Sequence, residues 1–316
     1  MRGRSAHTPS AIPWQGWWDV ARRVFNRLSD ANLSMLSAGV AFYAVLAIFP
    51  ALAAIVSLYA ILSDPAEIQA HLLAASAFVP SDVTEIFIAQ LTALSSQEQQ
   101  SLGLSLVGGV LLAIWSAHRG VNALVKAVTV AYREKETRNF LQLVALTYAL
   151  TFGAVILVVL TLSLMVGIPA VLSLLPLPEW IMATAGLTGW LLFFSMSVVS
   201  LGLLYRFASP RRPARWRWLS PGALLGTCVW LVGSTAFSLY VSQFSTYNQT
   251  YGALSAIMVL LMWFYVTSFS IIIGATLNAE LEHQTAQDTT IGEVKPLGKR
   301  DAYVADHVGK SASDLE

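Results

Sequence analysis

The side chains that most often carry enzyme chemistry are few and scattered in this chain of 316 residues. The five histidines stand far apart, no two of them at metal-ligand spacing, and the single cysteine, Cys228, lies inside an apolar run. No Gly-rich phosphate loop, G-x-S-x-G or H-E-x-x-H motif occurs. Glu134, Glu136, Glu280 and Glu282 are the acids that a divalent metal could use, but they are few and interleaved with basic residues. We therefore expect no catalytic residue, no metal and no cofactor, and predict that the protein is not an enzyme.

A different chemistry, the binding of a polar group inside a membrane, is indicated by Pro50. Proline removes an amide donor and its ring clashes with the carbonyl of Leu46, so we expect the helix to kink or open there. A broken helix at mid-depth exposes carbonyls that could hold a polar substrate; the alternative is a plain packing kink. The residues that we expect to line a substrate path are Ser37, Tyr43, Pro50, Trp115, Ser116, Asn248, Tyr251 and Asn278.

Long apolar segments must position these residues. The chain is 56% hydrophobic and 12% charged, whereas globular domains carry about 25% charged residues. A span of the bilayer needs about 20 apolar residues, and the charge-free run over 218–279 is long enough for two, separated by the polar stretch 242–252. We predict an all-α, polytopic membrane protein with six transmembrane helices near 34–62, 101–117, 140–165, 181–205, 219–241 and 253–279.

The distribution of charge predicts the orientation. All 19 lysines and arginines lie before the first span, between the second and third, between the fourth and fifth, or after the sixth, while the opposite loops carry acids alone. Because basic residues are retained on the cytoplasmic side, we expect a multi-pass protein of the bacterial inner membrane with both termini cytoplasmic (N-in/C-in) and no cleavable signal. The expected organisation is a cytoplasmic or interfacial helix over 1–30, a membrane domain over 31–282 with amphipathic extracytoplasmic helices over 63–100, and a flexible tail over 283–316.

Aromatic and basic residues alternate in the first 30 residues, a pattern typical of a helix that lies in the lipid headgroup layer. The alternative is a cytoplasmic helix packed on the loops. We expect membrane lipids as partners, together with a lipid or small-solute substrate, and no nucleic acid. The residues that we expect to contact anionic lipid are Arg22, Arg23, Arg211, Arg212 and Arg215.

Small and polar residues predict close helix contacts near the cytoplasmic side. Gly222 and Gly226 follow Pro221 at the start of the fifth span, and Gly274 and Asn278 lie one turn apart on the sixth. Small residues let two helix backbones approach, and an asparagine can donate and accept hydrogen bonds between helices. We expect Asn278 to bond across to another helix.

Several motifs together resemble one family. They are 41–50 (AFYAVLAIFP), 115–117 (WSA) with Gly120, Tyr132 with 136–138 (ETR), 247–252 (YNQTYG) and 274–281 (GATLNAEL). From about residue 31 to residue 281 the chain resembles the YihY/virulence factor BrkB family of bacterial inner-membrane proteins. The resemblance implies six membrane helices, a former mislabelling as ribonuclease BN, and links to serum resistance and to export of envelope lipid or lipopolysaccharide.

Two functions follow from these observations. The first is a transporter or flippase for an envelope lipid or small polar solute, acting without a titrating carboxylate in the membrane core. The second is a scaffold or regulator of envelope integrity that transports nothing. We do not expect ribonuclease activity.

Overall fold

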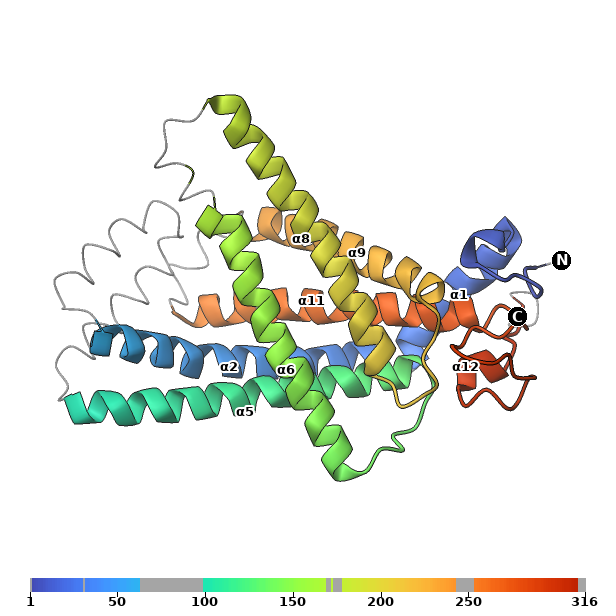
Figure 1. Cartoon of the computed structure of the whole chain (residues 1–316), viewed down its shortest axis with the longest axis horizontal. Helices are drawn as coiled ribbons and strands as arrows, with labels where there is room; N and C mark the ends of the chain where they lie inside the picture. The colour runs from blue at the N-terminus through green and yellow to red at the C-terminus, as the bar shows by residue number, and fades with distance from the viewer. Residues whose placement is uncertain are drawn as a thin grey trace. The chain divides into compact units, whose positions relative to one another are not determined.

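The computed structural model describes residues 2–30, 32–62, 99–168, 172, 178–242 and 253–311. Within these ranges most of the chain is helical, and β pairing is limited to an isolated antiparallel bridge between Ala214 and Thr290. The expected all-α class is therefore confirmed for the described residues (Figure 1). The elements are η1 (Pro9–Ala11), α1 (Trp14–Asp30), α2 (Leu33–Leu62), α5 (Gln99–Ala131), α6 (Phe140–Leu162), the π-helix η2 (Ser163–Gly167), α8 (Glu179–Phe207), α9 (Trp216–Ser242), α11 (Ala253–Glu282) and α12 (Tyr303–Asp306).

Five of the described helices are long and apolar enough to cross a membrane. The apolar segments are Leu33–Ala54, Phe140–Met165, Thr184–Phe207, Trp216–Ser242 and Ser255–Glu282. They expose many large apolar side chains, among them Leu187, Leu191 and Val232, as expected for helices surrounded by lipid tails. α5 covers the expected second span but is not among the five, so a sixth span stays a prediction. The expected extracytoplasmic helices over 63–100 fall almost wholly outside the described residues.

The chain forms two compact units, and the smaller one comprises Phe42–Gly120. In this unit α2 continues as a helix through Pro50, so the expected opening of the helix is not found. A Cβ atom placed on Gly109 of α5 would lie 3.0 Å from the Pro50 carbonyl oxygen and 3.2 Å from the Ala54 Cβ. The backbones of α2 and α5 thus approach closely beside the proline. A proline removes one hydrogen bond, which a packed membrane helix tolerates without breaking.

The larger unit comprises Met1–Ala41 and Val121–Glu316, and α9 and α11 form its most extensive helix pair. Gly222 and Gly274 face each other, and a Cβ atom on either glycine would overlap the carbonyl oxygen of the other. Asn278 joins the same helices: its Oδ1 accepts from the Gly222 amide at 2.7 Å, and its Nδ2 donates to the Leu219 carbonyl at 2.9 Å. The expected cross-helix hydrogen bond of Asn278 is confirmed, and it pairs backbone groups on both sides of Pro221.

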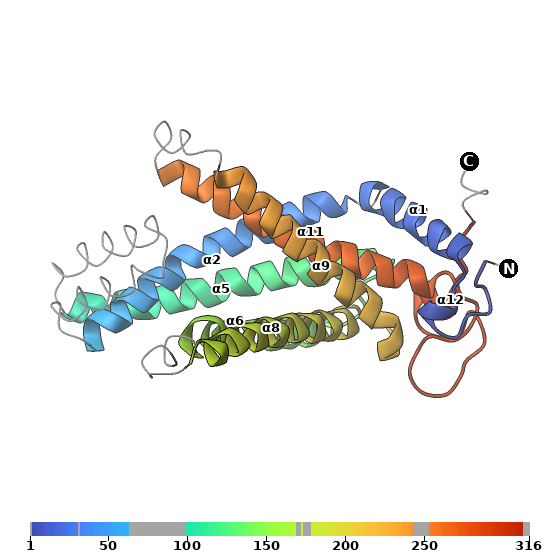
Figure 2. The ribbon, with the colours of Figure 1, turned by 90° about the horizontal axis from the view of Figure 1, so that it is seen from above.

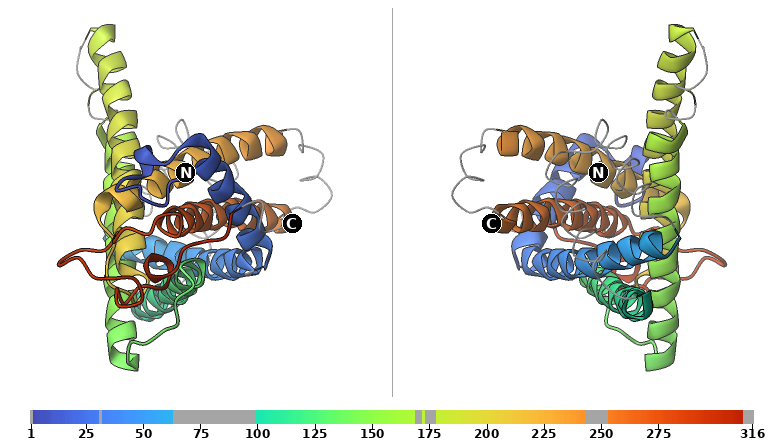
Figure 3. Two further views of the ribbon diagram at one scale, coloured as in Figure 1. Left: turned by 90° about the vertical axis from the view of Figure 1, so that its right-hand side faces the viewer. Right: turned by 90° about the vertical axis from the view of Figure 1, so that its left-hand side faces the viewer.

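The N-terminal segment and the residues after α11 fold together at one end of the larger unit, where Figures 1 and 2 mark both ends of the chain. The Arg4 carbonyl accepts from the Ala286 amide at 2.8 Å, and Gln284 Nε2 donates to the Arg2 carbonyl at 2.6 Å. The left view of Figure 3 faces this end, with the dark-blue start of the chain and the dark-red tail in front.

The structure differs here from the flexible tail that we expected over 283–316. Within the described part of that tail, Val304 and Ala305 are buried, and Arg300 donates to four backbone carbonyls. Those carbonyls belong to Ala286, Gln287, Lys295 and Ala305. The tail lacks sustained hydrophobic periodicity because one guanidinium, rather than an apolar stripe, organises it.

Replacing Arg300 with alanine should loosen this fold without unfolding the helices. Hydrogen bonds to a charged group contribute about 1.5–3 kcal/mol, so local opening should become roughly tenfold or more frequent. Limited proteolysis of the purified protein should show cleavage between residues 286 and 305 accelerating by that factor. Lys299→Ala, an exposed neighbour, is the matched control. Equal cleavage of the two variants would contradict the assigned role of Arg300.

Candidate functional site

Two places in the larger unit gather polar or aromatic side chains from several elements. The first is a buried charge cluster where α1, the end of α5, the connection between α8 and α9, and the end of α11 meet. The second is a groove lined by η2, α8 and α9.

Glu280 is the centre of the charge cluster and is fully buried near the end of α11. Its Oε2 accepts from Arg23 Nε at 2.7 Å, and its Oε1 accepts from Arg133 Nη2 at 2.6 Å. Arg23 Nη2 also donates to Gln284 Oε1 at 2.7 Å, and His283 Nδ1 lies 3.3 Å from Glu280 Oε2. One carboxylate therefore joins α1, the loop after α5, and α11.

Glu282 holds a second arginine. Its Oε2 accepts from Arg211 Nη2 at 2.7 Å and from Thr289 Oγ1 at 2.6 Å. The Arg211 guanidinium lies 4.7 Å from the ring centroid of buried Tyr132. Burial opposes the charge of Arg211, but Glu282, Tyr132 and Glu134 together outweigh burial, and the pKa of Arg211 is raised. Burial raises the pKa of the Tyr132 phenol well above its ordinary value, so that phenol is neutral. The acids of α11 thus act as links in helix packing.

The expected lipid contacts fall in several environments. Arg23, expected at the lipid surface, is only 5% exposed and bonded to Glu280, and Arg211 is buried against Glu282. Arg212 Nη2 donates to the Glu293 carbonyl, Arg215 Nε donates to the Thr290 carbonyl, and Arg22 is half-buried. The structure differs from the expectation for Arg23 because the sequence does not show which face of α1 meets Glu280.

The opposite face of α1 presents aromatic side chains. Trp14, Trp18 and Phe25 are 80%, 61% and 72% exposed, and spacings of four and seven residues place them on one side of the helix. Val20 on the other side is fully buried. This arrangement is the one expected for a helix at the membrane interface, with the buried arginine facing the protein instead of lipid.

The described residues of the expected substrate path are divided between the two units. In the larger unit, Ser37 Oγ donates to the Leu33 carbonyl, the Ser37 carbonyl accepts from Ser268, and Asn278 bonds to α9. Tyr43, Pro50, Trp115 and Ser116 belong to the smaller unit, where Ser116 is buried and Trp115 lies under the Arg119 guanidinium at 5.4 Å. Asn248 and Tyr251 lie outside the described residues.

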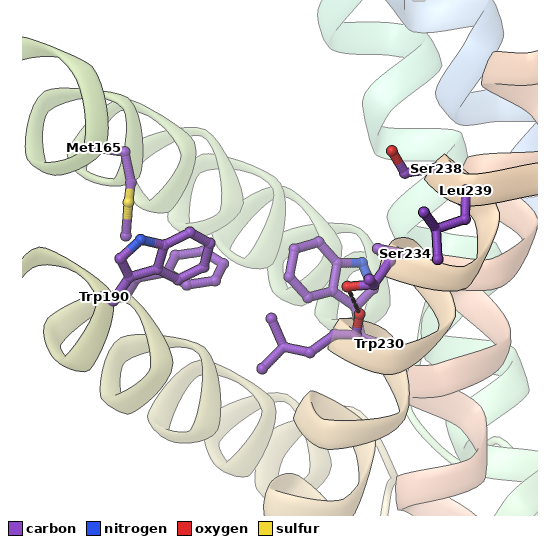
Figure 4. A pocket seen from close by; sticks show the side chains of 9 residues that line it. Met165, Trp190, Trp230, Ser234, Ser238 and Leu239 are labelled. Carbon is purple, nitrogen blue, oxygen red and sulfur yellow. Dashed lines mark hydrogen bonds between the residues drawn. The ribbon is translucent and has the colours of Figure 1, made fainter. Parts of the chain in front are cut away.

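The groove has a volume of about 390 Å³. Figure 4 shows Met165 of η2 pointing toward Trp190 of α8, with Trp230, Ser234 and Ser238 of α9 across from them. The remaining lining residues are Phe193, Leu231, Thr235 and Leu239. Ser234 Oγ is shielded from solvent and has no hydrogen-bond partner. The groove therefore combines apolar and aromatic walls with serine hydroxyls.

Two aromatic residues fix the wall between α8 and α9. The rings of Phe193 and Trp230 lie 5.7 Å apart, and Trp230 Nε1 donates to Thr267 Oγ1 of α11 at 3.0 Å. Sequence reasoning missed this groove. The spacing of Trp190 and Phe193, and that of Ser234 and Ser238, places each pair on one helix face, but many other residues in the spans share such spacings.

Across the described ranges, no group of three or more His, Cys, Asp or Glu residues is arranged to hold a metal ion. Glu280 and Glu282, the acids first considered as metal ligands, are occupied by arginines.

Comparison with known proteins gives consistent matches. The family model "Virulence factor BrkB" matches residues 24–297. The chain is 29% identical over 269 residues to the "Putative ribonuclease-like protein YfkH" of Bacillus subtilis, which covers 82% of this chain and 94% of that protein. It is 28% identical over 172 residues to the UPF0761 membrane protein IL2447 of Idiomarina loihiensis (53% of this chain, 58% of that protein). It is 25% identical over 266 residues to the UPF0761 membrane protein RSc1559 of Ralstonia nicotianae, and the match covers 82% of this chain and 58% of that protein.

No solved structure matches the chain significantly. The family match spans all five long apolar helices, and two of the relatives above are named as membrane proteins. The chain is therefore an integral membrane protein that belongs to the Virulence factor BrkB family.

Proposed function

We propose that this protein moves an envelope lipid, or a small polar solute of similar amphipathic character, across the bacterial inner membrane. The groove of Trp190, Phe193, Trp230 and Ser234 is the observation that carries this proposal. A lipid in transit needs an apolar surface for its tails and hydroxyls to replace the water around its headgroup. The groove offers an apolar surface and hydroxyl groups together, on helices α8 and α9, whose other exposed side chains are mostly apolar.

The proposed movement needs no titrating group in the membrane core. None of the nine residues that line the groove is ionisable. Carriers coupled to protons or sodium ions usually keep a carboxylate or histidine at depth. We therefore propose downhill movement, or coupling through helix dipoles rather than through an acid.

The proposed orientation is N-in/C-in with six spans. Contacts between the N-terminal segment and the residues after α11 hold both ends of the described chain on one side of the larger unit. The distribution of all 19 basic residues supports the cytoplasm as that side. The aromatic face of α1 supports its contact with the lipid interface.

Lipid movement in liposomes that contain the purified protein tests the proposal. The assay measures how fast a fluorescent phospholipid in the inner leaflet becomes accessible to an impermeant quencher, without and with an imposed pH gradient. We expect movement that requires no gradient and falls severalfold in Ser234→Leu, which fills the groove with an apolar side chain. Thr188→Leu is the matched control, because Thr188 is an exposed hydroxyl of α8 outside the groove.

Three results would contradict the proposal. They are lipid accessibility no faster than in protein-free liposomes, an absolute requirement for the gradient, and equal rates in the two variants. The first would favour the scaffold alternative. We also expect no metal-dependent RNA cleavage by the pure protein, in spite of the ribonuclease-like name of YfkH.

A further inference from the structure

A second pocket, with a volume of about 380 Å³, lies at the connection between α8 and α9. Four arginines line it: Arg138 from the loop before α6, Arg206 at the end of α8, and Arg211 and Arg212 from the connection. Asp301 of the tail is also on its wall. The pocket shares no lining residue with the groove described above.

Four hydrogen-bond donors of this pocket are shielded from solvent and have no acceptor. They are Arg206 Nε, Arg211 Nη1, Arg212 Nη1 and Ser209 Oγ. Ser209 is 4% exposed, and the side chain of Arg211 is 3% exposed. A buried donor without an acceptor costs about 1–3 kcal/mol, more when it is charged, so an acceptor supplied by a ligand would be favourable here.

Three of the four arginines have an acid beside them. Glu136 pairs with Arg138 through Nε and Nη2 of the arginine. Glu282 pairs with Arg211 through Nη2, which leaves Arg211 Nη1 without an acceptor. Asp301 pairs with Lys295, and Asp288 forms an ion pair with Arg212 Nη1 at 3.9 Å, which is too long for a hydrogen bond.

Arg206 has no carboxylate partner among the described residues. Its guanidinium lies 5.3 Å from the ring centroid of Trp216 and 5.8 Å from that of Phe207. Stacking of this kind fixes the plane of a guanidinium while its N–H groups stay available to an acceptor. The pocket therefore keeps positive charge in excess.

We propose that this pocket binds a phosphate-class anion through its arginines and Ser209. Planar guanidinium groups match phosphate geometry, and the charge-assisted bonds they form are among the strongest in proteins. A phosphate group of this kind could come from an anionic lipid headgroup or from free phosphate in solution.

The position of the pocket fits the lipid source without excluding the other. It follows the end of the apolar segment Thr184–Phe207 and precedes the start of Trp216–Ser242. Phe207 and Trp216 are both close to half exposed, and aromatic side chains of this kind are enriched at the level of lipid headgroups. The proposal does not depend on lipid movement through the groove.

Two binding measurements on the purified protein test the proposal and distinguish the sources. The first titrates inorganic phosphate into protein in neutral detergent and follows the thermal unfolding midpoint, with chloride at equal ionic strength as the reference. The second compares that midpoint in nanodiscs of phosphatidylcholine alone and of phosphatidylcholine mixed with phosphatidylglycerol. We expect a saturable rise in at least one of them; a rise with phosphatidylglycerol only identifies the lipid headgroup as the source.

The variants identify the pocket. Arg206→Gln and Ser209→Ala remove donors that make no ion pair, so the fold should persist, and we expect affinity to fall roughly tenfold or more for Arg206→Gln. Arg119→Gln is the matched control, because Arg119 also stacks on a tryptophan but lies elsewhere. The proposal is overturned if neither measurement shows a saturable rise, or if Arg206→Gln and Ser209→Ala bind as tightly as Arg119→Gln.

Discussion

Replacing Glu280 with alanine should destabilise the protein by about 3–5 kcal/mol, the usual cost of removing one partner from a buried ion pair. The carboxylate is fully buried and holds Arg23, which is itself only 5% exposed and would be left charged without a partner. Arg133, with 29% of its side chain exposed, can turn to water instead. Thermal unfolding of the protein in detergent should show a markedly lower midpoint.

Two further variants distinguish the loss of the ion pair from a general loss of side-chain packing at this position. Arg23→Met combined with Glu280→Met should recover most of the stability, because apolar side chains of similar size remove the unpaired charge. Glu136→Gln is the control for a partly exposed pair and should change the stability by about 1 kcal/mol or less. A Glu280→Ala protein as stable as Glu136→Gln would show that Glu280 does not link α1 to α11.

Alanine at Gly274 should lower the stability by about 3 kcal/mol or more, because the added Cβ atom meets a backbone rather than a flexible side chain. That atom would overlap the Gly222 carbonyl oxygen and the Tyr205 hydroxyl. Relief requires α9 and α11 to separate, which also strains both hydrogen bonds of Asn278. The yield of folded protein and its unfolding midpoint should both fall, and Gly222→Ala should behave alike.

Other glycines of the membrane helices provide matched controls. A Cβ atom on Gly153 of α6 or on Gly186 of α8 would meet nothing within 4 Å. Since alanine favours the helix over glycine, Gly153→Ala and Gly186→Ala should leave the midpoint unchanged or raise it slightly. Equal losses at all of these positions would mean that close contact between α9 and α11 is not what Gly274 provides.

The membrane helices and the cross-helix bond of Asn278 could be predicted from the sequence, because their signals are local, but the identity of its partner helix α9 could not. Apolar runs set the segments, and the spacing of Gly274 and Asn278 places both on one face of one helix. The effect of Pro50 could not be predicted in the same way. A proline removes a hydrogen bond locally, but whether the helix opens depends on the helices packed against it. Here Gly109 of α5 packs beside the proline.

The charge cluster could not be predicted, because its partners are remote in the chain. Arg23 and Glu280 are 257 residues apart, and no local pattern in either segment indicates that the two side chains pair. Arginines beside tryptophans indicate a lipid-facing helix equally well, so the sequence alone assigns Arg23 to lipid. The tail was missed for a related reason, since Arg300 binds backbone carbonyls and these leave no pattern in the side chains.

The ion pair between Arg23 and Glu280 also fixes when α1 can complete its packing during synthesis of the chain. α1 leaves the ribosome long before α11 exists, so throughout translation the first helix lacks the carboxylate that neutralises it. The contacts of Arg2 and Arg4 with residues 284–286 form only after α11 has been synthesised. A nascent chain that stops before Glu280 therefore lacks the carboxylate that binds Arg23, although Arg27 of α1 can already bond to the Val130 carbonyl.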